Sequence, residues 1–167
     1  MIRREPGLIA PGEVSFIAHA LCLPSRDPED RKRHDAEVEA IAVKVAWSHE
    51  ENLGARVRDV SKPDRARLAG LTDNPGFDLL SLHPDGQELA IEVKGRAGIG
   101  SIEVSDNEWA KALNLRERYW LFVVYDCASP HPRLRRIQDP FGRLLAAPKG
   151  GVIIDSREIL AAAEGGR

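Results

Sequence analysis

The run Tyr119–Tyr125 limits the fold of this chain more than any other feature, because it is apolar almost throughout. Side chains alternate between the two faces of a strand, so the sequence Tyr-Trp-Leu-Phe-Val-Val-Tyr predicts a strand that is covered on both faces. A chain of 167 residues can bury about 70% of the surface that its unfolded form exposes, and one compact domain is expected. We therefore predict an α/β fold in which a central sheet is flanked by helices.

Two helices are predicted from apolar spacing and capping signals. The first runs for about 18 residues from Asp35, which can cap its start, and ends before Gly54. The second is Asp106–Leu115, where Ser105 is the N-cap and Glu108 completes a capping box. Further short elements are expected as strands at 55–60, 101–104, 134–137 and 152–154, and as a last helix at 156–163.

Two segments lack a regular pattern. Residues 1–34 are rich in proline and charge, which indicates a connecting arm and not an independent core. The stretch that contains Lys62-Pro63 and Asn74-Pro75-Gly76 holds several turn-forming residues, so we expect it to be irregular.

A β-hairpin is predicted at residues 77–82 and 88–94, because the sequence between them suits a tight turn. If Pro84, Asp85 and Gly86 form a three-residue loop, His83 pairs with Gln87. In that register Asp78 lies directly across from Glu92, on the same face. A two-residue loop would instead put Asp78 on the opposite face of the sheet.

The predicted hairpin gathers chemically active side chains on one face. Glu92 and Lys94 are two residues apart and so share the face of Asp78, about 7 Å apart along the strand. Two opposed carboxylates repel each other, and a divalent cation relieves that conflict. Mg²⁺ (or Mn²⁺) prefers carboxylate oxygens and retains waters, one of which can attack a phosphodiester. Lys94 could orient or deprotonate that water, or offset charge in the transition state.

The spacing of Asp78, Glu92 and Lys94 is by itself a loose pattern, and the residues around them give the predicted site further support. The opposite face is fully apolar, with Phe77, Leu79, Leu89, Ile91 and Val93, and the chemical face also carries Leu80, Leu82 and Ala90. Charges in such a covered sheet are costly unless they are paired or ligated. Glu39 adjoins the apolar stripe of the first helix and could reach the metal, although Glu37 and Glu50 compete for that role and a solvated glutamate fits as well.

Charge and cysteine content narrow the functional classes. A net charge of −2 argues against a protein that coats nucleic acid by electrostatics alone. The basic clusters at residues 31–34, 56–67 and 133–136 fit either a solvated surface or a phosphate contact. No apolar run approaches the roughly 18 residues of a membrane span. Cys22 and Cys127 have no CxxC spacing or nearby His partner, so a reducing cytoplasm is expected.

Four motifs carry a resemblance to a known family. They are Asn74-Pro75-Gly76-Phe77-Asp78-Leu79-Leu80-Ser81, Ile91-Glu92-Val93-Lys94-Gly95-Arg96-Ala97, Ser105-Asp106-Asn107-Glu108-Trp109 and the strand Tyr119–Tyr125. In this order, over about residues 35–160, they resemble the domain named after the C-terminal region of the plant NO VEIN protein. The resemblance implies a restriction-endonuclease-like αβββαβ core with a central mixed sheet.

The same resemblance implies a PD-(D/E)xK nuclease signature, with catalytic Asp78, Glu92 and Lys94 and with Glu39 as the helix carboxylate. Here Gly-Phe-Asp replaces the signature's Pro-Asp. The implied metal ligands are Asp78, Glu92, Glu39 and the backbone carbonyl of Val93. Arg96, Asn107 and Lys111 are expected nucleic-acid contacts. Asn107-Glu108-Trp109 also has a structural interpretation, in which Glu108 caps the helix and Trp109 packs into the core.

The implied setting is a DNA-cleaving domain at residues 35–167, joined by the arm at 1–34 to a Swi/Snf-type helicase motor in cis or trans. Such a system would act in DNA defence or repair. A homodimer stays open, as does a nuclease directed to RNA or modified bases. The alternative from another class is a non-catalytic nuclease-fold module that binds DNA or a protein partner for the motor.

Overall fold

The structure, a computed structural model, describes residues 28–144, 147–148 and 152–163. In chain order, its elements are α1 (Pro28–Asn52), β1 (Arg56–Asp59), α2 (Pro63–Leu68), β2 (Leu79–Leu82), β3 (Glu88–Gly95), β4 (Ile102–Val104), α3 (Asp106–Leu115), the 3₁₀ turn η1 (Arg116–Arg118), β5 (Tyr119–Tyr125), β6 (Arg133–Gln138), α4 (Pro140–Arg143), β7 (Ala147–Pro148), β8 (Val152–Ile154) and α5 (Ser156–Ala162). Residues 1–27, most of the expected arm, lie outside the described residues. None of the described helices is both long and apolar enough to cross a membrane.

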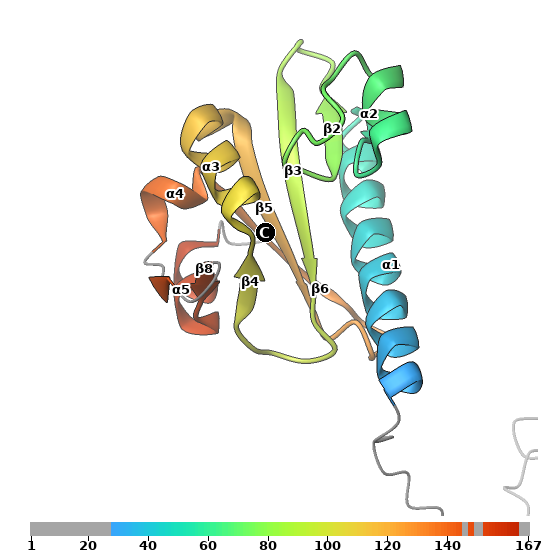
Figure 1. Cartoon of the computed structure of the whole chain (residues 1–167), viewed down its shortest axis with the longest axis vertical. Helices are drawn as coiled ribbons and strands as arrows, with labels where there is room; N and C mark the ends of the chain where they lie inside the picture. Colours follow the sequence, from blue (N-terminus) through green and yellow to red (C-terminus); the bar gives the residue numbers. More distant parts are fainter. Residues whose placement is uncertain (1–27, 145–146, 149–151, 164–167) are drawn as a thin grey trace, which may run out of the picture.

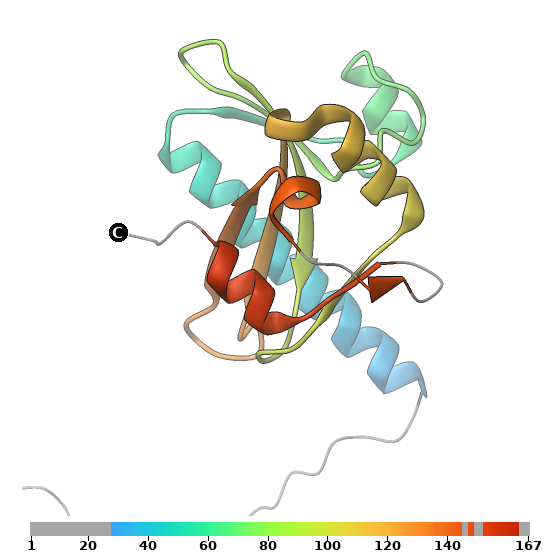
Figure 2. The ribbon, with the colours of Figure 1, turned by 90° about the vertical axis from the view of Figure 1, so that its left-hand side faces the viewer.

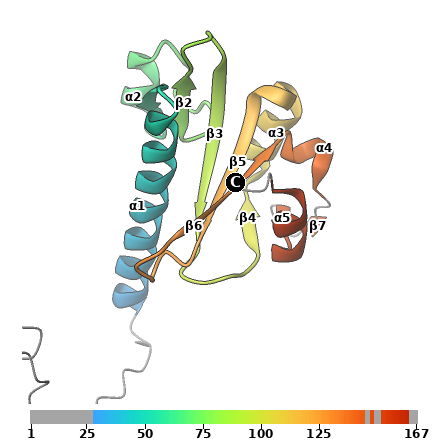
Figure 3. The same cartoon turned by 180° about the vertical axis from the view of Figure 1, so that it is seen from behind.

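A mixed five-stranded sheet with the order β1-β2-β3-β5-β6 forms the centre of the fold. Only the β3–β5 pair is parallel. Helix α1 covers one face of the sheet, and α3, α4, α5 and a small β4-β8-β7 sheet lie on the other (Figure 1, and from behind in Figure 3). Figure 2 shows α3 and α5 in front of the central sheet and α1 behind it. The predicted mixed α/β fold, with α1-β1-β2-β3-α3-β5 in the expected order, is confirmed.

Strand β5 is covered on both faces, as its apolar sequence predicts. All of its residues are buried. Trp120, Phe122 and Val124 join the core under α1. Leu121 and Val123 point the other way, into the core beneath β4, β8 and α5. The strand therefore anchors both layers of helices to the sheet.

The predicted hairpin register is confirmed. Leu79 pairs with Ile91 and Leu82 with Glu88. The backbone N–H of His83 donates to Gln87 O at 2.8 Å, and Gly86 N–H donates to His83 O at 3.0 Å. Gly86 has a φ of 87°, the left-handed conformation that a glycine adopts without a steric penalty. The turn is thus the three-residue loop. Asp78 lies just before β2, where the printed strand pairing ends, and its side chain lines the same cavity as Glu92.

Two expectations about helices were wrong. Helix α1 begins at Pro28, not at Asp35, so Asp35 lies inside the helix and does not cap it. Proline suits a first helical turn, and the charged residues after Pro28 carry no apolar period that would mark this extension. The stretch expected to be irregular contains α2, where Pro63 stands at the helix start and Asp64 lies in the first turn.

Phe77 was also predicted on the wrong face. It lies before β2 begins, and it packs with Val60, Ala66 and Tyr119 on the α3 side of the sheet. The preceding Gly76 has a φ of 79°, which redirects the chain just ahead of the strand. Strand alternation therefore does not extend back to Phe77. The remaining predicted elements occur at their expected positions, and α4 and β7 were not predicted.

Gly95 lets α1 approach the end of β3 very closely. A Cβ at this position would lie 2.9 Å from Val38 O and 3.0 Å from Ala42 Cβ. Both Val38 and Ala42 are buried in the core under α1. The missing side chain of Gly95 thus sets the distance between the helix and the strand that carries Glu92 and Lys94.

Replacing Gly95 with alanine should force α1 away from β3 and lower the free energy of unfolding by about 1–3 kcal/mol. Urea unfolding monitored by circular dichroism measures this change. The matched control is Gly98→Ala, since a Cβ there would meet nothing within 4 Å. Equal stability of the two variants would contradict the close-approach account.

Candidate active site

Glu92 lies in the middle of β3 and is buried, with only 3% of its surface exposed. It points to the α3 side of the sheet, opposite to Ile91 and Val93, which join the core under α1. Its Oε1 lies 2.7 Å from Lys94 Nζ. An ion pair between the two therefore forms along one face of a single strand, as residues two apart allow.

Asp78 is held beside Glu92 by the backbone of β3. Its own N–H donates to Ile91 O at 3.0 Å. Its Oδ2 accepts a hydrogen bond from Val93 N–H at 2.9 Å. The loop before Asp78 is fixed from the other side, because the buried Tyr119 hydroxyl donates to Gly76 O at 2.9 Å. The Asp78 carboxylate is thus placed by backbone contacts.

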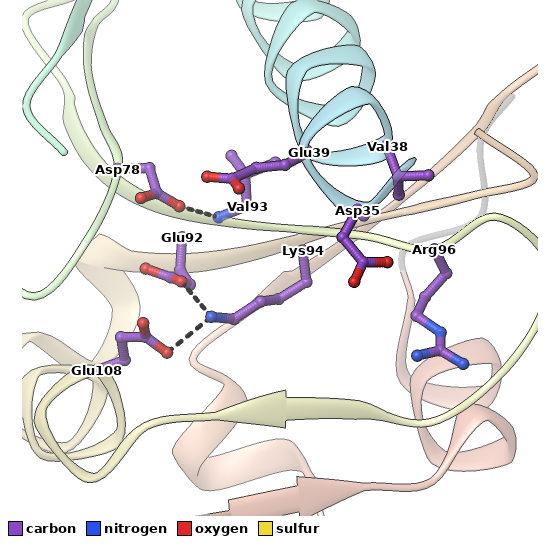
Figure 4. A pocket seen from close by; sticks show the side chains of 10 residues that line it. Asp35, Val38, Glu39, Asp78, Glu92, Val93, Lys94, Arg96 and Glu108 are labelled. Atoms are coloured by element: carbon purple, nitrogen blue, oxygen red, sulfur yellow. Dashed lines mark hydrogen bonds and ion pairs between the residues drawn. The ribbon is translucent and has the colours of Figure 1, made fainter. Parts of the chain in front are cut away.

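A third carboxylate reaches the site from α3. Glu108 Oε2 lies 2.8 Å from Lys94 Nζ, so the lysine bridges Glu92 and Glu108 (Figure 4). Glu108 also completes the predicted capping box with Ser105, which is confirmed. Trp109 contacts the ring of Phe141 at 5.4 Å and packs against the core on the α3 side, as expected.

These side chains line an open cavity of about 500 Å³. Five carboxylates and two basic side chains border it, namely Asp35, Glu39, Asp78, Glu92 and Glu108 with Lys94 and Arg96. Figure 4 shows the carboxylate of Glu39 pointing from α1 toward Asp78, while Arg96 stands at the far side. The cavity therefore has an excess of formal negative charge.

Burial and neighbouring negative charges raise the pKa values of the central carboxyls. Burial raises the pKa of Asp78 to about 6, although the Val93 hydrogen bond opposes this. Burial, and then the charge of Asp78, raise the pKa of Glu92 well above its ordinary range. For Lys94, burial opposes the charged form, but Glu92 and Glu108 outweigh it and hold its pKa above the usual value. Lys94 is therefore an ammonium at neutral pH.

The donors fit a hard divalent cation. The side chains around Asp78 and Glu92 offer only carboxylate oxygens as anionic ligands, which Mg²⁺ and Mn²⁺ prefer. The raised pKa values of Asp78 and Glu92 show that too little positive charge surrounds them to stabilise both as carboxylates. Within the described part of the chain, no group of three or more His, Cys, Asp or Glu side chains is arranged so that it could hold a metal ion. A cation would thus be held by the Asp78–Glu92 pair with backbone or water oxygens completing its shell.

The structure separates the predicted site residues into two groups. Asp78, Glu92 and Lys94 meet, and Glu39, Val93 and Arg96 line the same cavity. Asn107 and Lys111 instead lie over Gly76, where a Cβ would be 3.0 Å from Lys111 Cβ and 3.4 Å from Asn107 Nδ2. Lys111 borders a separate cavity of about 290 Å³ with Phe77, Leu80 and Ala90.

The competitors of Glu39 lie away from the cavity. Glu37 is exposed and is not among the lining residues. Glu50 is buried near the other end of α1, where Ser81 Oγ donates to its Oε2 at 2.7 Å and His83 Nε2 lies 2.8 Å from the same oxygen. Of the three helix glutamates considered, Glu39 is the one placed at the cavity.

Two charged lining residues, Asp35 and Glu108, were not predicted as site residues. Asp35 was interpreted as a helix cap, and Glu108 only as part of a capping box. The sequence does contain a signal for Glu108, since the polar start of α3 follows β3 along the chain with only β4 between them. That signal indicates proximity to β3 only once the sheet order is known.

The fold and the acidic cavity define a mixed α/β domain with one carboxylate on β3 and another just before β2 in the same cavity. Residues 38–137 match the family described as "Protein NO VEIN, C-terminal". This match covers more than half of the chain, and the chain belongs to that family. Comparison with curated proteins and with solved structures gave no match.

The raised pKa values predict that stability falls as pH rises. Asp78 and Glu92 favour the protonated form in the fold, so their contribution is complete below about pH 4 and is lost as pH passes the folded pKa, which is about 6 for Asp78. Without divalent cations, the free energy of unfolding should decrease between pH 5 and 7, by up to about 1.4 kcal/mol per pH unit for each proton released. Urea titrations in chelator measure this slope.

Asp78→Asn should make the free energy of unfolding depend less steeply on pH, because the amide cannot ionise. The matched control is Asp73→Asn, which removes an exposed carboxylate that pairs with Arg67. If Asp78→Asn kept the wild-type slope, the protonation account of Asp78 would be incorrect.

Proposed function

We propose that this domain is a Mg²⁺- or Mn²⁺-dependent DNA nuclease of the PD-(D/E)xK type. One observation carries the proposal: Asp78, immediately before β2, and Glu92, on β3, line one open acidic cavity with Lys94 beside them. Opposed, desolvated carboxylates weaken a fold unless they serve a charged ligand. The family membership and the αβββαβ order add support, since the resemblance implies the nuclease signature at these three residues.

Each residue has a distinct role in the proposal. Asp78 and Glu92 hold the cation, together with the backbone carbonyl of Val93. Glu39 adds a carboxylate from α1, and its side chain points toward Asp78 (Figure 4). When bound, the cation supplies positive charge for the phosphate oxygens and makes an attacking water more acidic.

Lys94 is suited to offset negative charge that develops on the phosphate. Its ammonium is held by ion pairs and is not free to accept a proton at neutral pH. Of the roles that the sequence leaves open, electrostatic stabilisation and orientation of the water therefore fit better than general-base catalysis. Glu92 and Asp78 remain the groups that can accept a proton in this cavity.

DNA must approach a cavity that carries excess negative charge, so local cations have to guide the phosphates. Arg96 is exposed, lines the cavity and is one such group. Asn107 and Lys111 extend this surface along α3 in the proposal. A helicase motor in cis or trans, in DNA defence or repair, would supply the remaining DNA affinity.

The test is cleavage of supercoiled plasmid and forked DNA by the full chain with Mg²⁺ or Mn²⁺. Glu92→Ala and Lys94→Ala should each lower the rate roughly a hundredfold or more, because each removes a group required at the reacting phosphate. The matched control is Glu88→Ala, which removes an exposed carboxylate of the same strand that pairs with Arg118. Its rate should stay within about twofold of the wild type.

If both Glu92→Ala and Lys94→Ala still cleaved DNA, the assignment of Glu92 and Lys94 as catalytic residues would be wrong. Absence of cleavage of any DNA form, together with absence of Mn²⁺ binding by calorimetry, would favour the other function. The domain would then be a non-catalytic module that binds DNA or a protein partner for the motor.

A further inference from the structure

Lys94 has two carboxylate partners that come from different elements. One is Glu92 on its own strand, with Nζ 2.7 Å from Oε1, and the other is Glu108 on α3, with Nζ 2.8 Å from Oε2. The side chains of Lys94 and Glu108 are each 22% exposed, whereas that of Glu92 is 3% exposed. The lysine therefore stands between a buried carboxylate and one nearer to solvent.

Glu108 is fixed independently of Lys94. The same Oε2 accepts a hydrogen bond from Ser105 N–H at 2.9 Å, and the Glu108 N–H donates to Ser105 Oγ. Helix α3 is itself held against the loop before Asp78, where Gly76 lets Lys111 approach closely. The carboxylate of Glu108 thus has a defined position relative to the Asp78 loop as well as to β3.

Under the proposed function, Glu92 has two competing positive partners. A cation between Asp78 and Glu92 would draw Glu92 away from the Lys94 ammonium. A largely buried ammonium without a partner is costly, so the loss of that ion pair would oppose cation binding. Glu108 offers Lys94 a second partner that does not depend on Glu92.

We infer that Glu108 is a positioning residue that keeps the Lys94 ammonium in the site when Glu92 engages the cation. The inference rests on the proposed function. Glu108 acts through Lys94 and contacts neither the cation nor the substrate. A purely structural cap predicts an effect on stability alone, so the two roles can be separated.

The experiment is a double-mutant cycle read out by calorimetric titration of Mn²⁺ into the full chain. The four proteins are wild type, Glu108→Gln, Lys94→Met and the double variant. Glutamine can also complete a capping box, so the helix start is retained, and thermal unfolding of each protein checks this. The matched control is Asp106→Asn, which removes an exposed charge from the same helical turn without touching Lys94.

Glu108→Gln should weaken Mn²⁺ binding roughly tenfold, because the cation must then displace Lys94 from its remaining partner. In the Lys94→Met background the same change should have less than about a twofold effect. Asp106→Asn should bind like the wild type. This pattern supports the inference.

If Glu108→Gln weakened Mn²⁺ binding equally in the wild-type and Lys94→Met backgrounds, Glu108 would act on the cation itself. If it weakened Mn²⁺ binding in neither background, Glu108 would serve only as a helix cap. Both results overturn the inference while the proposed function stands. Failure of the wild type to bind Mn²⁺ is a different result, since it removes the proposed function and the inference with it.

Discussion

The turn formed by Pro84, Asp85 and Gly86 sets the β2–β3 register, and the rest of the site depends on that register. Leu79 lies opposite Ile91 at the start of β2, and Asp78, immediately before it, donates its N–H to Ile91 O and lines the cavity together with Glu92. A shift by one residue would turn every side chain of one strand to the other face and would bury Asp78 under α1. The same register leaves Val93 N–H available to the Asp78 carboxylate. Local turn chemistry thus determines which charges meet in the cavity.

Close approach of two helices at glycines builds the walls of this cavity. Helix α1 meets β3 at Gly95, and α3 meets the loop before Asp78 at Gly76. The first contact brings Glu39 to the rim, and the second brings Glu108 to Lys94. The result is a site with more carboxylates than basic groups, whose central members are protonated more readily than ordinary acids. A divalent cation is the ligand that best balances such a site.

Much of this arrangement could be predicted from the sequence, where the signals were local. The apolar run of β5, the Ser105 cap and the Gly86 turn each specify their own element, and each prediction was confirmed. The misses have physical causes: the charged first turns of α1 carry no apolar period, and Phe77 lies before β2 begins, where strand alternation does not apply. The contact of Glu108 with Lys94 joins two elements in space, and residue spacing along the chain does not encode it.

The central claim is that Asp78 and Glu92 hold a divalent cation, and Mn²⁺-soaked crystals examined by anomalous diffraction test it most directly. We expect an anomalous peak between these two carboxylates and beside the Val93 carbonyl, with Lys94 Nζ moved from Glu92 toward Glu108. An absence of density there at a Mn²⁺ concentration used for cleavage, with Lys94 still paired to Glu92, would contradict this claim.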